Sequence, residues 1–152
     1  ENETRINIPV CKEEGYAQDS LELSQWSLHG SAHMIGDELE LTGLNTFQVG
    51  SAFVLEKTVM ADHVQIDFQY KTDGGTGADG ISLTALDANR MTTFLGGAGC
   101  GIGYGGDAAC TAGPALPGWS LEVDTYYNDG QDPTSEDHLM FTFDGDVDAS
   151  FA

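Results

Sequence analysis

The segment from Glu122 to His138 holds the residues whose types and spacing could do chemistry, and it reads E-V-D-T-Y-Y-N-D-G-Q-D-P-T-S-E-D-H. Side chains alternate across an extended backbone, so Glu122, Asp124 and Tyr126 would share one face of a strand. Two carboxylates on one face of a mostly apolar strand repel each other and lose hydration unless a cation neutralises them. A turn would return three further metal-binding side chains towards that face, namely Asn128, Asp132 and His138. The segment therefore predicts a metal site.

The ligand types predict which ions this segment would hold. Ca²⁺ prefers hard oxygen donors, which Asp124, Asn128 and Asp132 supply together with a backbone carbonyl. An imidazole beside carboxylates suits a borderline ion such as Mn²⁺ or Zn²⁺, and here that set would be Glu122, Asp124, Asp132 and His138. We therefore expect Ca²⁺, with Mn²⁺ or Zn²⁺ as a second ion. The alternative is that these acids form a solvated turn without any ion.

The elements that must position these ligands are predicted to be strands. Apolar and polar residues alternate most clearly from Val64 to Tyr70, and the pattern stops at the turn-forming residues Thr72 to Gly77. Further strands are expected at Glu38–Thr42, Ser51–Leu55, Ile81–Leu86, Leu121–Tyr126 and Leu139–Phe143. No segment has a sustained apolar face at helical spacing. Short strands at this spacing predict one all-β domain over residues 1–152, built as a sandwich or barrel.

The composition limits the classes of partner. The chain has 152 residues, of which 40% are hydrophobic, and its 20 glycines favour a turn-rich β protein. Five basic and 25 acidic residues give a net charge of -20, which repels phosphate backbones and anionic lipids. We therefore expect no nucleic-acid partner. No apolar run is long enough to span a membrane, so we also expect no membrane insertion.

The three cysteines, Cys11, Cys100 and Cys110, favour an oxidising compartment, and we expect a secreted, extracellular protein. A bridge from Cys100 to Cys110 would close the glycine-rich segment between them, and three reduced thiols are the alternative. The segment Gly96 to Gly106, which contains Cys100, has glycine spacings that imitate a dinucleotide-binding fingerprint, but the β-α-β context is missing. It is either a tight surface loop or a wall of a binding site.

The acidic run Asp144 to Asp148 lacks the glycine of a helix-loop-helix calcium site, and we expect a solvated turn.

Three motifs in this order resemble the legume-type lectins and related bacterial extracellular domains. They are A-D-G-I-S-L at Ala78 to Leu83, L-G-G-A-G-C-G-I-G-Y at Leu95 to Tyr104, and P-G-W-S-L-E-V-D-T-Y-Y-N at Pro117 to Asn128, which D-P and D-H follow. The resemblance covers residues 30–143. It implies an antiparallel jelly-roll sandwich, the concanavalin-like lectin and glucanase fold.

The resemblance also implies a role for individual residues. It implies that Glu122, Asp124, Asp132 and His138 bind the transition metal, and that Asp124, the Tyr126 carbonyl, Asn128 and Asp132 bind calcium. It implies that Asp79, a glycine near Gly99 and the amide of Asn128 bind the sugar, and that the Ala78–Asp79 peptide bond is cis. Asp129 and Asp137 remain alternatives to Asp132, because the loop does not keep the commonest spacing of the family.

The same residues suit a sugar on chemical grounds. Adjacent hydroxyls donate and accept hydrogen bonds, which a carboxylate, an amide and a backbone N–H can satisfy while an aromatic ring covers the apolar sugar face. We expect Tyr104 and Tyr127 to supply that ring. The chain is therefore predicted to be a calcium-dependent carbohydrate-binding module with a glycan ligand, and not an enzyme. An adhesion or structural module that keeps the metals without binding sugar is the alternative.

A glycoside hydrolase is a weaker alternative. Retaining glucanases on a related sandwich use E-x-D-x-x-E, and Glu122 and Asp124 fit its first two positions. The third position falls on Tyr127, which cannot protonate a leaving group as a carboxylic acid does. The lectin fold normally continues for several strands beyond the segment equivalent to His138 to Phe143, whereas this chain ends at Ala152. We therefore expect a second chain or segment to complete the sandwich.

Overall fold

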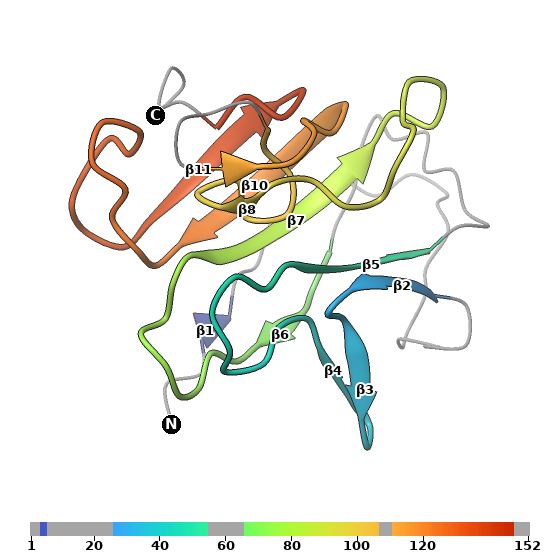
Figure 1. Ribbon diagram of the computed structural model, residues 1–152, viewed down its shortest axis with the longest axis horizontal. Helices are drawn as coiled ribbons and strands as arrows, with labels where there is room; N and C mark the ends of the chain where they lie inside the picture. The colour runs from blue at the N-terminus through green and yellow to red at the C-terminus, as the bar shows by residue number, and fades with distance from the viewer. Residues whose placement is uncertain (1–3, 6–25, 55–65, 107–110, 148–152) are drawn as a thin grey trace.

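The computed structural model describes residues 4–5, 26–54, 66–106 and 111–147 of the chain. Every regular element in these ranges is a β-strand, and every pairing between strands is antiparallel (Figure 1). This confirms the predicted all-β class. The strands are β1 (Thr4–Arg5), β2 (Trp26–Gly30), β3 (His33–Ile35), β4 (Glu38–Glu40), β5 (Gly50–Val54), β6 (Gln69–Tyr70), β7 (Gly80–Leu86), β8 (Ala98–Gly99), β9 (Thr111–Ala112), β10 (Gly118–Asp124) and β11 (His138–Phe143).

The largest sheet has the order β11-β10-β7, with β10 in the middle. Residues directly opposite each other in antiparallel strands point to the same side of the sheet. The registers Trp119↔Phe143 and Trp119↔Ala85 therefore define one apolar face, which also carries the other odd-numbered residues of these strands. The opposite face is polar and buried, because Ser120, Glu122 and Asp124 are at most 3% exposed. Met140 is also buried on this face, at 2% exposed, and the large apolar side chains that are exposed on the other face all belong to β11.

Four pairs of shorter strands make up the rest of the described structure. They are β2 with β5, β3 with β4, β8 with β9, and β1 with β6. In Figure 1, β2 and β5 run below the three-stranded sheet, and the β3–β4 hairpin projects from the bottom of the molecule. These elements form separate two-stranded sheets, so the described residues show antiparallel sheets without showing a continuous jelly roll.

Four of the six predicted strands are present with both ends within two residues, and the strand expected at Leu121–Tyr126 is β10, which begins three residues earlier, at Gly118. The strands expected at Ile81–Leu86 and Leu139–Phe143 correspond to β7 and β11. The strand expected from Val64 to Tyr70 is wrong in extent, since residues 66–68 have no regular structure and only Gln69–Tyr70 pairs, with Thr4–Arg5. Val64 lies outside the described residues. Alternation alone therefore overestimated the length of this strand among the described residues.

The glycine-rich segment is a tight loop that folds back on itself. The N–H of Gly97 donates to the Gly105 carbonyl at 2.7 Å, and a Cβ atom on Gly96 would lie 2.6 Å from the Gly103 oxygen. Only a residue without a side chain fits that approach. The hydroxyl of Ser82 in β7 donates to the Ile102 carbonyl at 3.0 Å and fastens the loop to the large sheet. Cys100 in this loop is disulfide-bonded. Cys11 and Cys110 lie outside the described residues, so the Cys100–Cys110 pairing stays a prediction.

The acidic run after β11 begins with a turn, as predicted, but its first carboxylate is not merely solvated. Asp144 Oδ1 accepts hydrogen bonds from Arg90 Nη2 at 2.8 Å and from the Gly118 N–H at 3.0 Å. The neighbouring Asp87 carboxylate accepts a hydrogen bond from Arg90 Nε at 2.6 Å. Arg90 therefore connects the ends of β7 and β11, and Asp144 connects β11 to the start of β10.

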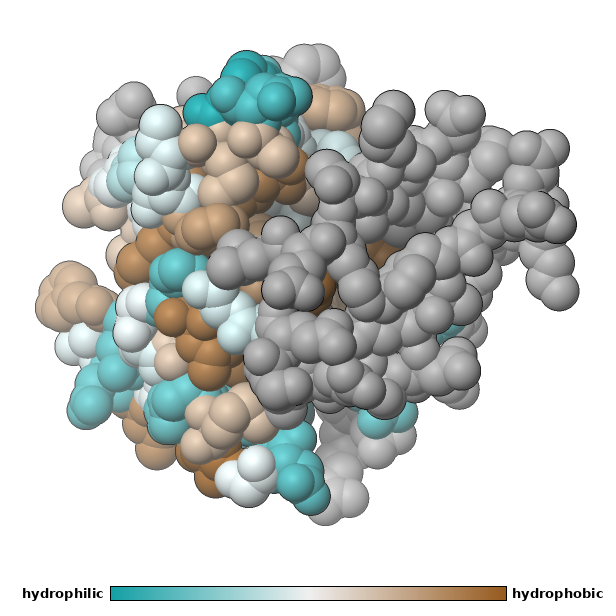
Figure 2. Space-filling view, turned by 90° about the vertical axis from the view of Figure 1, so that its right-hand side faces the viewer, coloured by the Kyte–Doolittle hydropathy of each residue, from teal (hydrophilic) through white to brown (hydrophobic). Residues whose placement is uncertain are grey.

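Hydrophobic side chains reach the surface in several places, and Figure 2 shows brown hydrophobic residues between hydrophilic ones on one side of the molecule. The largest group by element is on β11, where Leu139, Phe141 and Phe143 are 55%, 42% and 50% exposed. Among the described residues, the structure contains no helix with the length and hydropathy needed to cross a membrane.

Candidate metal centre

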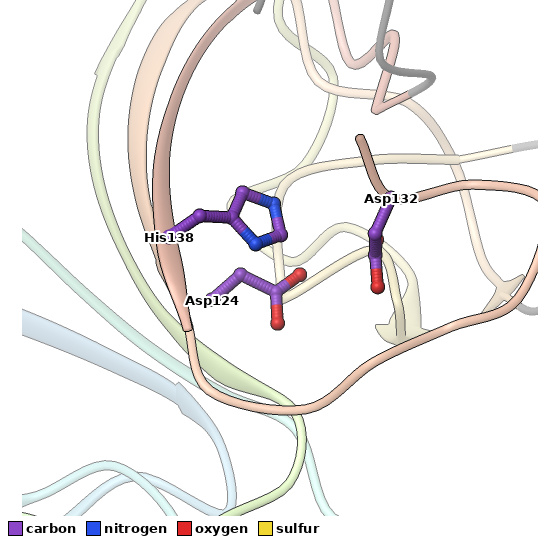
Figure 3. Close-up of side chains that lie close together, drawn as sticks. All are labelled: Asp124, Asp132 and His138. Carbon is purple, nitrogen blue, oxygen red and sulfur yellow. The ribbon is translucent and has the colours of Figure 1, made fainter. Parts of the chain in front are cut away.

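The pairing of β10 with β11 places Asp124 directly opposite His138. The loop between the two strands returns Asp132 to the same place, so that one ligand atom from each of the three side chains lies within 4.8 Å of the others. Figure 3 shows the imidazole and the two carboxylates facing a common space. Asp129 and Asp137 are exposed and are not part of this group. The geometry therefore favours Asp132 over both of them as the ligand from this loop.

The loop is held in shape by a turn between Asn128 and Asp132. The N–H groups of Gln131 and Asp132 donate to the Asn128 carbonyl at 3.0 and 3.2 Å, and the Asn128 N–H donates to Asp132 Oδ2. The first carboxylate is fixed as well, because the Tyr126 N–H donates to Asp124 Oδ1 at 2.9 Å. The two acids of the metal group are thus oriented by backbone N–H groups.

A second segment, around Asp79, meets this loop. Asn128 Nδ2 donates to Asp79 Oδ1 at 3.4 Å. Thr125 strengthens the junction, since its N–H donates to the Asp79 carbonyl at 3.0 Å and its hydroxyl donates to the Gly77 carbonyl at 2.6 Å. The Ala78–Asp79 peptide bond is cis, which confirms that expectation. Two of the expected sugar-binding residues, Asp79 and Asn128, therefore lie side by side.

Glu122 lies on the same face of β10 as Asp124 and is 1% exposed. Its Oε1 accepts a hydrogen bond from the Thr142 hydroxyl at 2.7 Å. Its Oε2 is buried and has no hydrogen-bond partner among the described residues, and the same is true of Asn128 Oδ1 and His138 Nε2. Three of the predicted ligands therefore each carry a buried atom with an unsatisfied lone pair, a state that costs about 1–3 kcal/mol per group.

The other nitrogen of His138 explains how its ring is oriented. His138 Nδ1 lies 3.0 Å from the Glu136 carbonyl oxygen. A carbonyl only accepts, so Nδ1 must carry the proton and donate it, and in the neutral ring Nε2 then keeps its lone pair. A backbone carbonyl bonded to the far nitrogen is the usual support of a metal-binding histidine.

Burial dominates the electrostatics of the acidic groups. It raises the pKa of Glu122 from 4.5 to about 7, and Asp124 and Asp132 add to that rise while the Thr142 hydrogen bond opposes it. The pKa values of Asp79 and Asp124 are also raised, in both cases mainly by burial and further by Asp132. Several carboxylates thus share a region that disfavours their negative charge, which is the condition that a bound cation would relieve.

The donor set fits both classes of ion that the sequence predicts. Asp124 and Asp132 supply carboxylate oxygens and Asn128 an amide oxygen, as Ca²⁺ prefers. His138 adds an imidazole, as Mn²⁺ or Zn²⁺ prefers, whereas Glu122 lies outside the group of Asp124, Asp132 and His138. The buried atoms without partners in these residues are the observation that links the predicted ligands to a metal.

The remaining predicted residues are distributed differently. Tyr127 is 46% exposed and its hydroxyl donates to Asp129 Oδ1 at 3.1 Å, so one edge of its ring is held while the side chain remains accessible. Tyr126 is 47% exposed. Gly99 lies in β8 with a φ of 67°, within the loop that Ser82 fastens to the sheet. The expected backbone donation from Gly99 to a sugar stays a prediction.

Tyr104 corrects one expectation. It is 0% exposed, and its hydroxyl donates to the Gly118 carbonyl at 2.9 Å. A ring with no accessible face cannot stack on a sugar, so the expected stacking role of Tyr104 is wrong. The glycine-rich loop folds over this ring, which is part of the buried core.

Two residues that support the site were missed at the sequence level. Thr125 connects to Gly77 across 48 positions, and Thr142 connects to Glu122 across 20. Neither spacing resembles a motif, because both contacts depend on strand pairing. The contact of Thr142 could be predicted only from the register of β10 with β11, which places Thr142 diagonally across from Glu122 on the polar face. No protein-family model matches this chain.

Proposed function

We propose that the chain is a calcium-dependent carbohydrate-binding module of legume-lectin type, in which a two-metal loop positions Asp79 and Asn128 for the sugar. The observation that carries the proposal is the meeting of the Asp124, Asp132 and His138 group with the Asn128–Asp79 pair. A metal group alone would suit many proteins. A carboxylate and an amide held beside it, in the order that the resemblance requires, favour a lectin.

Each ligand has a defined part in this proposal. Asp124, Asn128, Asp132 and the Tyr126 carbonyl hold Ca²⁺, whereas Glu122 and His138 complete a Mn²⁺ or Zn²⁺ set with Asp124 and Asp132. The bound cations supply positive charge that keeps the buried carboxylates ionised. Asn128 and Asp132 connect the loop to Asp79, because Asn128 donates to both Asp132, through its backbone, and Asp79, through its side chain.

The sugar-binding side of the proposal uses three types of contact. The carboxylate of Asp79 accepts hydrogen bonds from sugar hydroxyls, the amide of Asn128 donates one, and a backbone N–H near Gly99 donates another. Tyr127 covers the apolar face of the sugar ring, since it is the one of the two expected stacking residues that is exposed. No residue of the site is assigned a catalytic step, and the module binds without hydrolysing.

Two measurements test the proposal in sequence. Calorimetric titration of EDTA-treated protein with Ca²⁺ should show saturable binding, and a glycan array should give a signal that requires Ca²⁺. Asp79→Ala should remove the array signal while Ca²⁺ still raises the melting temperature. An array that stays blank for the parent protein, with Ca²⁺ binding intact, would instead support a metal-stabilised adhesion or structural module. Absence of Ca²⁺ binding would reject both.

The proposal extends to the architecture and the location of the protein. The sheet β11-β10-β7 would be part of a jelly-roll sandwich, whose remaining strands a second chain or segment supplies. The exposed apolar residues of β11 support this, because a sandwich covers such a face with another sheet. The disulfide at Cys100 supports an oxidising, extracellular location.

A further inference from the structure

Thr142 and Glu122 occupy diagonal positions on the buried polar face of the large sheet. In the register of β10 with β11, Thr142 lies opposite Ser120, and Glu122 lies opposite Met140. Thr142 and Glu122 are therefore on the same side of the sheet, and each is 1% exposed. Diagonal neighbours on one face are close enough for side chains to touch.

The contact between them orients the Glu122 carboxylate. The Thr142 hydroxyl donates to Oε1 at 2.7 Å, while Oε2 has no hydrogen-bond partner among the described residues. The terminal torsion of a glutamate is soft, and without an external contact the two oxygens exchange places at little cost. A hydroxyl bound to one oxygen removes that freedom and leaves the other oxygen for a different partner.

The free oxygen lies on the face that carries the metal group. Asp124 is two residues further along β10, so it points to the same side as Glu122, and His138 lies directly opposite Asp124. Two residues before Glu122 in β10, the Ser120 hydroxyl oxygen accepts a hydrogen bond from the Thr84 hydroxyl at 3.4 Å. The buried face of β10 therefore carries, in order, Ser120 with its Thr84 contact, Glu122 with its Thr142 contact, and Asp124 of the metal group.

We propose that Thr142 is a positioning residue, which holds Glu122 as a single-oxygen ligand and so makes the centre selective for a transition metal over calcium. This inference rests on the proposed function, because it assumes that the Asp124, Asp132 and His138 group binds an ion. Glu122 belongs to the transition-metal set and not to the calcium set. Loss of the orientation of the Glu122 carboxylate should therefore weaken Mn²⁺ binding and leave Ca²⁺ binding almost unchanged, whereas general destabilisation of the fold would weaken the binding of both ions.

Two substitutions at this position separate the hydroxyl from the packing. Thr142→Val keeps the shape of the side chain and removes the donor, and Thr142→Ser keeps the donor and removes one methyl group. Removal of such a supporting hydrogen bond typically costs about tenfold to a hundredfold in metal affinity. We expect Thr142→Val to weaken Mn²⁺ binding within that range, and Thr142→Ser to stay within about threefold of the parent protein.

The experiment is a calorimetric titration of the full EDTA-treated chain with Mn²⁺ and, separately, with Ca²⁺. The electron paramagnetic resonance spectrum of the Mn²⁺-saturated protein reports the ligand geometry, so it should change in Thr142→Val and not in Thr142→Ser. Urea unfolding without metal measures any loss of stability. If Thr142→Val unfolds, Glu122→Gln replaces it, and that variant should also weaken Mn²⁺ selectively.

The outcomes distinguish this inference from the function on which it rests. Equal Mn²⁺ affinities for Thr142→Val and the parent protein would overturn the role of Thr142 and leave the lectin proposal intact. Equal losses of Mn²⁺ affinity in Thr142→Val and Thr142→Ser would also overturn it, because the hydroxyl would then not be the cause. Equal losses of Mn²⁺ and Ca²⁺ affinity in Thr142→Val would overturn it as well. A parent protein that binds neither ion rejects the proposed function and this inference together.

Discussion

Glu122 is a buried carboxyl group whose surroundings would suit a bound cation. The carboxyl is buried, one oxygen is bound by a hydroxyl and the other has no partner among the described residues. A protein selected for stability alone would place an apolar residue there, since an unpaired buried charge is costly. In the proposed function, a cation bound at the neighbouring Asp124, Asp132 and His138 group would satisfy the second oxygen.

The raised pKa of Glu122 predicts how the metal-free protein responds to pH. Its folded pKa is about 7 and its ordinary value is 4.5, so between these values the folded state holds a proton that the unfolded state has lost. Its contribution to stability is therefore complete below about pH 4.5 and is lost as the pH rises through about 7. The loss amounts to about 3 kcal/mol at most.

Urea unfolding in EDTA at several pH values between 5 and 8 measures this effect, with Glu122→Gln as the matched control. The amide cannot ionise, so the free energy of unfolding of that variant should fall less steeply over the same range. Asp79 and Asp124 also have raised pKa values, and they lower the stability in the same direction in both proteins, so the test compares the slopes of the two curves. Parallel curves for the two proteins would show that Glu122 does not titrate in this range.

At the scale of the elements, strand β10 does most of the positioning. It supplies Glu122 and Asp124, and its pairings with β11 and β7 bring His138 and Gly80 to either side of Asp124. Asp79, directly before Gly80, is therefore delivered to the metal loop by the same register. A shift of one residue in either pairing would turn these side chains to the opposite face.

Gly80 is the position where that register can be tested. A Cβ atom on Gly80 would lie 2.3 Å from the Val123 carbonyl oxygen and 3.1 Å from the Asp124 Cα atom. Gly80→Ala should therefore push β7 away from β10 at the metal group. We expect the free energy of unfolding to fall by about 2 kcal/mol and the Ca²⁺ affinity to fall at least about tenfold. Urea unfolding and calorimetry measure the two effects.

Gly36→Ala is the control for this substitution. Gly36 has a φ of 60°, and a Cβ atom there would meet nothing within 4 Å. Alanine in that left-handed conformation costs about 1–2 kcal/mol, without moving any strand near the site. The control should lose stability and keep its Ca²⁺ affinity. If both variants lose affinity equally, global destabilisation rather than the β7–β10 register would be responsible.

The sequence allowed prediction of the parts whose signal is local. Alternation located β7 and β11, and the carboxylate spacing identified Asp124, which the structure places with Asp132 and His138. The extent of the strand expected from Val64 and the exposure of Tyr104 were wrong, since both depend on which segments meet in space. Thr142 was missed for the same reason, because its partner Glu122 lies on another strand. The choice of Asp132 over Asp129 and Asp137 also needed the loop geometry.

At the scale of the whole molecule, the two faces of the large sheet have opposite characters. The metal group and the buried hydroxyls occupy one face, and Leu139, Phe141 and Phe143 lie partly exposed on the other. Trp119 stacks on Phe141 with ring centroids 5.5 Å apart, and Phe141 meets Phe143 edge-on at 5.0 Å. A net charge of -20 keeps copies of the chain apart over long distances, but it does not remove this local attraction for other apolar surfaces.

Replacement of Leu139, Phe141 and Phe143 by threonine tests whether the two faces act independently. Threonine preserves the preference for a strand, and it removes most of the exposed apolar area of β11. We expect weaker fluorescence of a hydrophobic dye and less self-association in sedimentation experiments at high salt, where the net charge is screened. The affinities for Ca²⁺ and Mn²⁺ should stay within about threefold, because the substituted side chains point away from the metal group. A large loss of metal affinity in calorimetry would contradict this separation, and it would mean that the apolar residues of β11 stabilise the polar face through the sheet.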